Sequence, residues 1–293
     1  MLISLFDSQP IVSNSIANAE RARAAGLHRY WAPQVMNAST MLTLGAVAAA
    51  VPDIGLGTSV MAMQTMLPQT MAQQSRTLNQ ISGCRFTLGI GVNHEPVVTN
   101  RWGLPWAKPY SRFVDYLNAM TPLLEGNPVD VSGEYFSHTT EIAVPGDAPD
   151  LMLAALGPKM LSLAGERTSG TITWMTGPNT IADHIRPNLD NAGGAKIVAG
   201  VSVISTASDE ETEAARNWAN KALAIYPPLP SYRAVMDREG ATDAADLVLI
   251  GDADTVAAGI DRYRGAGTDE VALNFMGAPE QNDRSWDLVS NLV

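Results

Sequence analysis

The chain has 293 residues, of which 46% are hydrophobic and 17% are charged. This composition provides enough apolar material for a large core and too little charge for a disordered chain. The formal net charge of −11 argues against a basic surface for a phosphate backbone, so no nucleic-acid partner is expected. The single cysteine, Cys84, excludes an intrachain disulfide and a cysteine-cluster metal site, and it favours a reducing, cytoplasmic location.

No membrane segment is expected either. The first ten residues contain no basic stretch, and Asp7 interrupts their apolar run, unlike a signal peptide or an anchor. The longest apolar stretch, at 44–51, is much shorter than the ~20 residues of a spanning helix.

Short β-type runs alternate with helical segments along the chain. Amphipathic patterns predict helices at 13–25, 39–50, 68–82 and 252–266. Continuous apolar runs, typical of strands buried on both faces, predict strands at 2–6, 27–31, 54–60, 85–90, 151–155, 171–175, 196–205 and 270–275.

This order predicts an α/β fold, a (β/α)8 TIM barrel, with a doubly wound sheet as the alternative. Segments 126–150 and 226–246 exceed the usual connection length and are predicted as insertions after strands 4 and 7. We expect a single domain over residues 1–293.

In such a barrel the active site lies on the loops that follow the carboxyl ends of the strands. The strand at 85–90 runs into Gly91, Val92, Asn93 and His94. The third glycine of a dinucleotide fingerprint is missing, so the glycines indicate either close approach of a flat ring or a bend in the strand. His94 is the candidate proton-transfer residue, because the ordinary pKa of histidine lies near neutral pH.

A second loop, 156–160, turns from a strand into a helix through Gly157 and Pro158. Free backbone N–H groups together with Lys159 predict an anion site, unless the segment is an ordinary turn with a solvated lysine. We find no spacing for a metal site, a carboxylate pair or a nucleophile elbow. Loops with so few ionisable groups suit a ring cofactor that carries the reaction itself.

Several segments resemble the bacterial luciferase-like monooxygenase superfamily. They are Gly57-Thr58-Ser59-Val60, the Ala-Gln-Gln stretch at 72–74, and the Ser-Gly-Cys-Arg-Phe-Thr-Leu-Gly-Ile-Gly stretch at 82–91. Segment 156–160 and Trp174 resemble the branch that uses the deazaflavin coenzyme F420 rather than FMN. The resemblance implies a (β/α)8 barrel, usually a homodimer, with a non-prolyl cis peptide bond that maps onto Ser59-Val60.

The resemblance also implies which residues bind the cofactor. They are Ser59, Val60, Met61, Val92, Asn93, Leu156, Gly157, Pro158, Lys159, Met160 and Thr176. The sequence departs from the glucose-6-phosphate dehydrogenases of that branch, because Pro33-Gln34 replaces their Asp-His pair and His94 replaces a glutamate. Oxidation of a sugar phosphate is therefore not expected.

The resulting hypothesis is a coenzyme F420-dependent oxidoreductase with a small-molecule substrate. Hydride would pass between C5 of the deazaflavin and a C=C, C=N or C=O group, with His94 or an ordered water supplying the proton. The alternatives are an FMN-dependent monooxygenase or reductase and a non-catalytic protein that binds F420 or flavin. No metal is expected.

Overall fold

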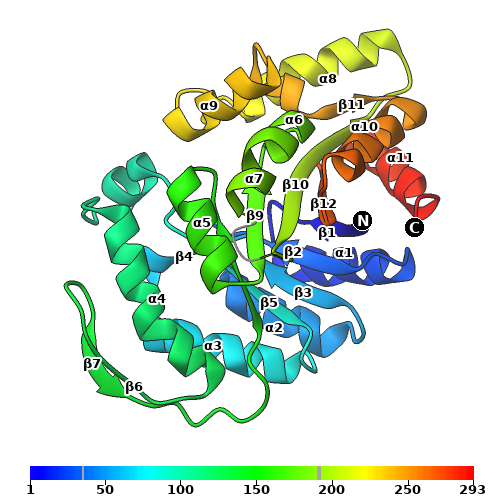
Figure 1. Ribbon diagram of the computed structural model, residues 1–293. Helices are drawn as coiled ribbons and strands as arrows, with labels where there is room; N and C mark the ends of the chain where they lie inside the picture. The colour runs from blue at the N-terminus through cyan, green and yellow to red at the C-terminus, as the bar shows by residue number, and fades with distance from the viewer. Residues whose placement is uncertain (35, 190–192) are drawn as a thin grey trace. The chain divides into compact units, whose positions relative to one another are not determined.

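The computed structural model describes residues 1–34, 36–189 and 193–293 (Figure 1). Contacts divide the chain into two compact units. Unit 1 comprises Met1–Ser8, Glu20–Trp31 and Ala155–Val293, and unit 2 comprises Gln9–Ala19 and Ala32–Ala154. Neither unit is contiguous in the sequence.

The main strands of unit 1 are parallel and follow the order β9-β10-β12-β1-β2. Buried Glu270 ties three of them together, because it accepts hydrogen bonds from Ser4 Oγ and Trp31 Nε1, each at 2.6 Å. The short strand β11 extends the sheet beside the last part of β10. The bounds are β1 (Leu2–Phe6), β2 (Arg29–Ala32), β9 (Gly170–Trp174), β10 (Lys196–Ser205), β11 (Leu249–Gly251) and β12 (Glu270–Phe275).

Unit 2 contributes the parallel strands β3 (Gly55–Thr58), β5 (Phe86–Gly91) and β8 (Asp150–Ala154), in that order. The predicted fold class is confirmed: β1, β2, β3, β5, β8, β9, β10 and β12 are the eight strands of a (β/α)8 barrel. The predicted strand at 54–60 is broken, because β3 ends at Thr58 and pairing with β5 resumes at β4 (Met61–Ala62).

Helices separate the strands. Helix α1 (Val12–Ala24) is divided between the two units. The helical segments of unit 1 are α5 (Pro158–Arg167), α6 (Pro178–Thr180), η3 (Ile181–Ile185), α7 (Arg186–Leu189), α8 (Asp209–Ala222), α9 (Pro230–Glu239), η4 (Ala244–Leu247), α10 (Ala253–Gly265) and α11 (Pro279–Ser290). In unit 2 they are α2 (Thr40–Ala50), η1 (Met63–Thr65), α3 (Pro68–Ile81), η2 (Val97–Arg101) and α4 (Pro109–Glu125). None of these described helices is long and apolar enough to cross a membrane.

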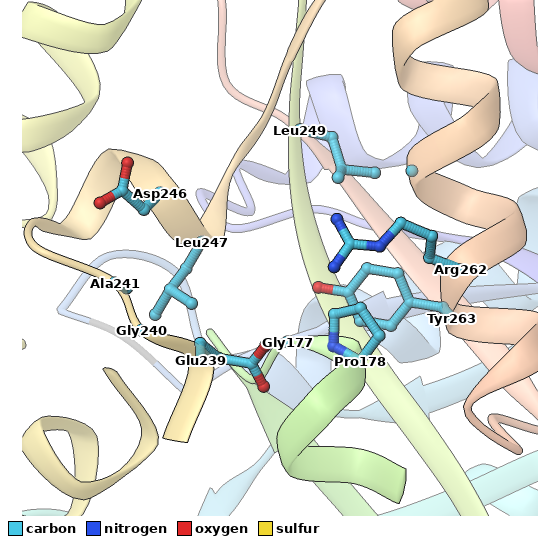
Figure 2. A pocket seen from close by; sticks show the side chains of 11 residues that line it. Gly177, Pro178, Glu239, Gly240, Ala241, Asp246, Leu247, Leu249, Arg262 and Tyr263 are labelled. Atoms are coloured by element: carbon cyan, nitrogen blue, oxygen red, sulfur yellow. The ribbon is translucent and has the colours of Figure 1, made fainter. Parts of the chain in front are cut away.

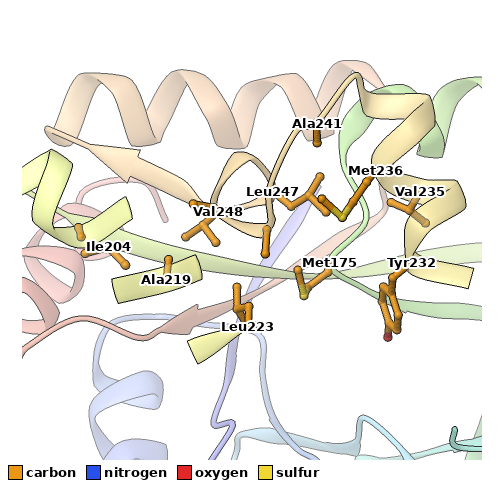
Figure 3. Close-up of a cluster of buried hydrophobic side chains, with 13 residues drawn as sticks. Met175, Ile204, Ala219, Leu223, Tyr232, Val235, Met236, Ala241, Leu247 and Val248 are labelled. Atoms are coloured by element: carbon orange, nitrogen blue, oxygen red, sulfur yellow. The ribbon is translucent and has the colours of Figure 1, made fainter. Parts of the chain in front are cut away.

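Two connections carry extra elements. The chain between β5 and β8 forms α4 and the antiparallel hairpin of β6 (Val129–Ser132) and β7 (Ser137–Thr140), which lies beside α4 in Figure 1. The chain between β10 and β12 forms α8, α9, η4, β11 and α10. A hydrophobic cluster anchors this second connection to β9 and β10, with Leu223, Val235, Leu247, Met175 and Ile204 among its members (Figure 3).

Candidate functional site

In unit 2 the ends of β3 and β5 are joined through a buried hydroxyl group. Thr58 Oγ1 donates to Gly89 O at 2.8 Å and accepts from Gly89 N at 2.9 Å. The next peptide bond, Ser59-Val60, is cis and non-prolyl, as the resemblance predicted. Both residues are partly exposed at the end of β3.

Gly91 lies at the end of β5, where the backbone is crowded. A Cβ atom here would lie 3.0 Å from the Ala154 Cβ atom and 3.2 Å from the Val60 Cγ2 atom. Such contacts would force both neighbours to shift, so the fold itself favours glycine at this position. Packing alone therefore explains a glycine at position 91, without a bend in the strand and without a ligand.

Polar side chains around these strand ends mostly hold the backbone. Gln34 Oε1 accepts from Ala62 N at 2.8 Å, and Gln64 Nε2 donates to Val92 O at 2.7 Å. Asn93 adopts a left-handed conformation with φ 58°, and its Oδ1 accepts from His94 N at 2.7 Å. One acceptor is left over, since Gln64 Oε1 is buried and has no hydrogen-bond partner among the described residues.

His94 is partly buried directly after this turn. Burial lowers the pKa of His94 below its ordinary value of 6.5, because desolvation disfavours the imidazolium. The imidazole is therefore mainly neutral at pH 7, whereas the sequence suggested titration near neutral pH. A neutral imidazole can still donate one N–H and accept at the other nitrogen.

In unit 1 the predicted anion loop opens α5. Gly157 precedes the helix, Pro158 is its first residue, and the Lys159 side chain is exposed. A Cβ atom on Gly157 would meet no other atom within 4 Å, so space is open beside this backbone. Pro158 has no N–H group, and the N–H groups of Met160 and Leu161 donate to Gly157 O. The backbone N–H groups of Gly157 and Lys159, together with the lysine side chain, favour an anion at the start of this ten-residue helix.

His184, in η3, contacts the backbone of this loop. Its Nε2 lies 2.8 Å from Leu156 O, so the ring donates to the carbonyl that precedes Gly157. The sequence analysis did not identify His184 as a candidate residue. No sequence signal could have revealed this contact, because a helical pattern does not identify the carbonyl that a side chain meets.

The end of β9 carries an aromatic group. The ring centroid of Trp174 lies 4.9 Å from that of Phe6 and 6.4 Å from that of Tyr226. Met175 follows with φ 48°, an uncommon conformation for a residue other than glycine. Thr176 is buried, and its Oγ1 donates to Trp174 O at 3.1 Å.

The structure thus groups the predicted residues in two sets, one in each unit. Met61 and Thr176, one in each set, are buried, which favours a packing role for both side chains. The unit 2 set is Ser59, Val60, Met61, Val92, Asn93 and His94, and the unit 1 set is Leu156, Gly157, Pro158, Lys159, Met160 and Thr176.

Both sets have features of a ligand site. The open space at Gly157 and the charge of Lys159 suit a phosphate group. The buried Gln64 Oε1 would accept from a ring N–H group. Within the described residues, no group of three or more His, Cys, Asp or Glu side chains could hold a metal ion.

Comparisons with known proteins give consistent matches. The family model for luciferase-like monooxygenases matches residues 7–270. A 5,10-methylenetetrahydromethanopterin reductase from Archaeoglobus fulgidus is 31% identical over 219 residues, which cover 71% of this chain and 63% of that enzyme. The match therefore spans less than two thirds of that relative's length.

Solved structures share the fold. The coenzyme F420-dependent tetrahydromethanopterin reductase from Methanopyrus kandleri superposes with a TM-score of 0.83 at 20% identity, over 100% of this chain and 99% of that chain. The oxygenating constituent of 3,6-diketocamphane monooxygenase from Pseudomonas putida, in complex with FMN, gives a TM-score of 0.77 at 17% identity, over 99% and 97% of the two chains.

Proposed function

Because the chain belongs to the luciferase-like monooxygenase family, we propose that it is an enzyme, an oxidoreductase that uses coenzyme F420. The observation that carries this proposal is the open backbone at Gly157 beside Lys159 at the start of α5, which suits an anionic cofactor. The similarity to the Archaeoglobus fulgidus and Methanopyrus kandleri reductases favours F420 over FMN.

Different residues would contact different parts of the cofactor. Leu156, Gly157, Pro158, Lys159 and Met160 would bind its phosphate and side chain. Ser59, Val60, Val92 and Asn93 would contact its ring, and the buried residues Met61 and Thr176 are further candidates for the cofactor site. When bound, F420 supplies a two-electron donor or acceptor at C5 of its deazaflavin ring.

His94 would manage the proton. Reduction of a C=O, C=N or C=C group adds a hydride to carbon and a proton to the other atom of the double bond. The mainly neutral His94 imidazole can donate an N–H hydrogen bond that orients this atom. The proton itself would come from the imidazolium form of His94, or from an ordered water bound to the ring, and solvent would then replace it. The same group would accept the proton in the reverse direction.

Two alternatives remain distinct from this proposal. FMN is bound by the diketocamphane monooxygenase, which shares the fold, so an FMN-dependent monooxygenase or reductase is the second candidate. A non-catalytic F420-binding or flavin-binding protein is the third, because residues 88–94 offer only one ionisable side chain, His94.

Titration of the purified protein with F420 and with FMN distinguishes these candidates. The proposal requires saturable F420 binding at least ~10-fold tighter than FMN binding, a difference of about 1.4 kcal/mol. It also requires hydride exchange between F420 and at least one member of a panel of enones, imines, ketones and alcohols. Preference for FMN selects the second candidate, and F420 binding without any exchange selects the third.

We further propose that the protein forms a homodimer through α2 and α3. No charged residue occurs in α2, and the only one in α3, Arg76, is buried and donates to Leu124 O and Val144 O. The exposed surface of both helices is therefore uncharged, and Leu42, Leu67 and Ile81 are 77%, 58% and 50% exposed around it. A second copy of the chain is an occupant that such an uncharged surface, which is apolar on α2 and carries exposed glutamines on α3, would favour.

We also propose a single domain and a cytoplasmic location. Residues 1–293 form one domain, because each unit is assembled from segments that the other unit separates, and neither could be excised as a continuous chain. The single cysteine supports a cytoplasmic location.

A further inference from the structure

A separate cavity lies within unit 1, bordered by the start of α6, the end of α9, η4, β11 and α10 (Figure 2). Its volume is about 170 Å³. Since a water molecule occupies ~30 Å³ of the liquid, this space holds roughly five waters or one small organic ion. None of the proposed cofactor-binding residues lines it.

The two carboxylates that line the cavity are already engaged. Glu239 Oε1 accepts from Thr180 N at 2.5 Å, and its Oε2 accepts from Asn179 N at 3.3 Å. Asp246 Oδ1 binds Arg216 at 2.5 Å, and Oδ2 accepts from two backbone N–H groups. The charge of Asp246 is balanced by Arg216, whereas the charge of Glu239 is solvated by two backbone N–H groups and not neutralised.

Two hydrogen-bond donors that line the cavity, the side chains of Arg262 and Tyr263, have no acceptor among the described residues. The Arg262 side chain is exposed and has no hydrogen bond or ion pair to any residue that the structure describes, and Figure 2 shows its guanidinium directed into the cavity. Tyr263 is 3% exposed, and its hydroxyl group points the same way without a hydrogen bond within the described chain. The Tyr263 oxygen is not among the fully buried side-chain atoms without a partner, so water in the cavity can reach it, and an oxyanion would replace that water as the acceptor.

The protonation state of Tyr263 supports this role. Burial raises the pKa of Tyr263 well above its ordinary value, and the nearby Glu239 carboxylate raises it further, against a smaller opposing effect of Arg262. The phenol is therefore a permanent donor at neutral pH. A donor pair of one guanidinium and one phenol matches an oxygen anion.

We propose that this cavity is a binding site for a small oxyanion, held by Arg262 and Tyr263 and separate from the cofactor site. The carboxylate of a short organic acid and a phosphate group share the required chemistry. Leu249 lies near Arg262 and Leu247 lies across the cavity from the two donors (Figure 2), so an aliphatic stem would gain apolar contact there. Binding does not depend on the proposed activity.

The test is calorimetric titration of the cofactor-free protein at constant ionic strength with inorganic phosphate, acetate and butyrate, and with chloride as the blank. We expect saturable 1:1 binding of at least one oxyanion. Tighter binding of butyrate than of acetate identifies an organic acid, and preference for phosphate identifies a phosphate ligand. Absence of saturable binding for all three would show that the cavity only holds water.

Variants assign the binding to these residues. Arg262→Gln and Tyr263→Phe should each weaken binding at least ~10-fold, the effect of losing one hydrogen bond to an anion. Arg264→Gln is the matched control, since Arg264 lies in the same last turn of α10 but pairs with Asp261 outside the cavity. Equal effects of Arg262→Gln and Arg264→Gln would reduce the binding to general charge and overturn the site.

Saturating F420 is the second control. It should leave the affinity for the oxyanion within ~3-fold, less than the ~10-fold change that 1.4 kcal/mol produces. Competitive displacement would assign the cavity to the cofactor and refute a separate site. Failure of F420 to bind at all would overturn the proposed function and leave the anion result valid.

Discussion

Replacement of Gly157 by alanine tests whether glycine is needed at this position for cofactor binding or for the stability of the fold. Gly157 has φ −92° and ψ 150°, an extended conformation that any residue can adopt. It is exposed, and no atom would lie within 4 Å of an added Cβ. The folded protein alone therefore has room for the methyl group, and only a bound ligand would oppose it.

The expected change in stability is small because two effects offset each other. Restricting the unfolded chain stabilises an alanine variant by about 0.4–1 kcal/mol. Alanine is also a poorer residue than glycine before the first helical turn, at a cost of roughly 0.5–1 kcal/mol. We expect the free energy of unfolding of Gly157→Ala to stay within about 0.5 kcal/mol of the wild-type value.

The expected change in cofactor affinity is large. A methyl group in the space proposed for a phosphate would remove at least one charge-assisted hydrogen bond, worth about 1.5–3 kcal/mol, or roughly 10- to 100-fold in Kd. F420 titration and thermal unfolding of the same preparation measure both quantities. Gly45→Ala, at a helical glycine that also has nothing within 4 Å, is the control and should bind F420 normally.

Unchanged F420 affinity in Gly157→Ala would refute the reasoning, because no cofactor atom could then approach this backbone. A fall in affinity that accompanies a fall in melting temperature would also count against it. In that case the loop would have changed shape instead of losing space for the ligand.

Further predictions concern Lys159, His94 and Leu42. Lys159→Ala should weaken F420 binding about 10- to 100-fold at low salt, with a smaller difference in high salt, as titrations at two ionic strengths can establish; an unchanged affinity would make Lys159 a solvated residue. His94→Ala should lower turnover at least ~10²-fold with little change in F420 affinity. Because burial lowers the His94 pKa in the folded state, the unfolded state binds more protons below pH 6.5, so wild-type stability should fall there and the fall should be smaller in His94→Ala. Leu42→Arg should shift the protein toward monomer in sedimentation experiments, whereas Ile225→Arg, at a position 53% exposed outside α2 and α3, should not.

The order of strands and helices could be predicted from the sequence because it depends on local periodicity. The strand at 196–205 is a continuous apolar run, and its observed bounds match the prediction. The strand at 54–60 was predicted as continuous, but β3 ends at Thr58. Composition could not locate this break, because Gly57 to Val60 is compatible with a strand throughout.

The tertiary environment of side chains could not be predicted in the same way. The sequence identifies His94 as a candidate, but its lowered pKa arises from burial by residues distant in the chain. The contact of His184 with Leu156 O joins residues 28 positions apart, and Arg262 and Tyr263 reach a cavity formed with α6 and α9. Helical periodicity indicates the buried face of an element, not the group that faces it.

These observations also explain why the reaction would depend on a cofactor. Residues 59–64 contain no ionisable side chain, and residues 88–94 contain only His94. The amide of Gln34, the Nε2 group of Gln64 and the hydroxyl of Thr176 are bound to the protein itself, so they position backbone instead of reacting. We propose that such a site binds an anion through Lys159 and moves one proton through His94. The two electrons of the proposed oxidoreductase would then come from the bound ring.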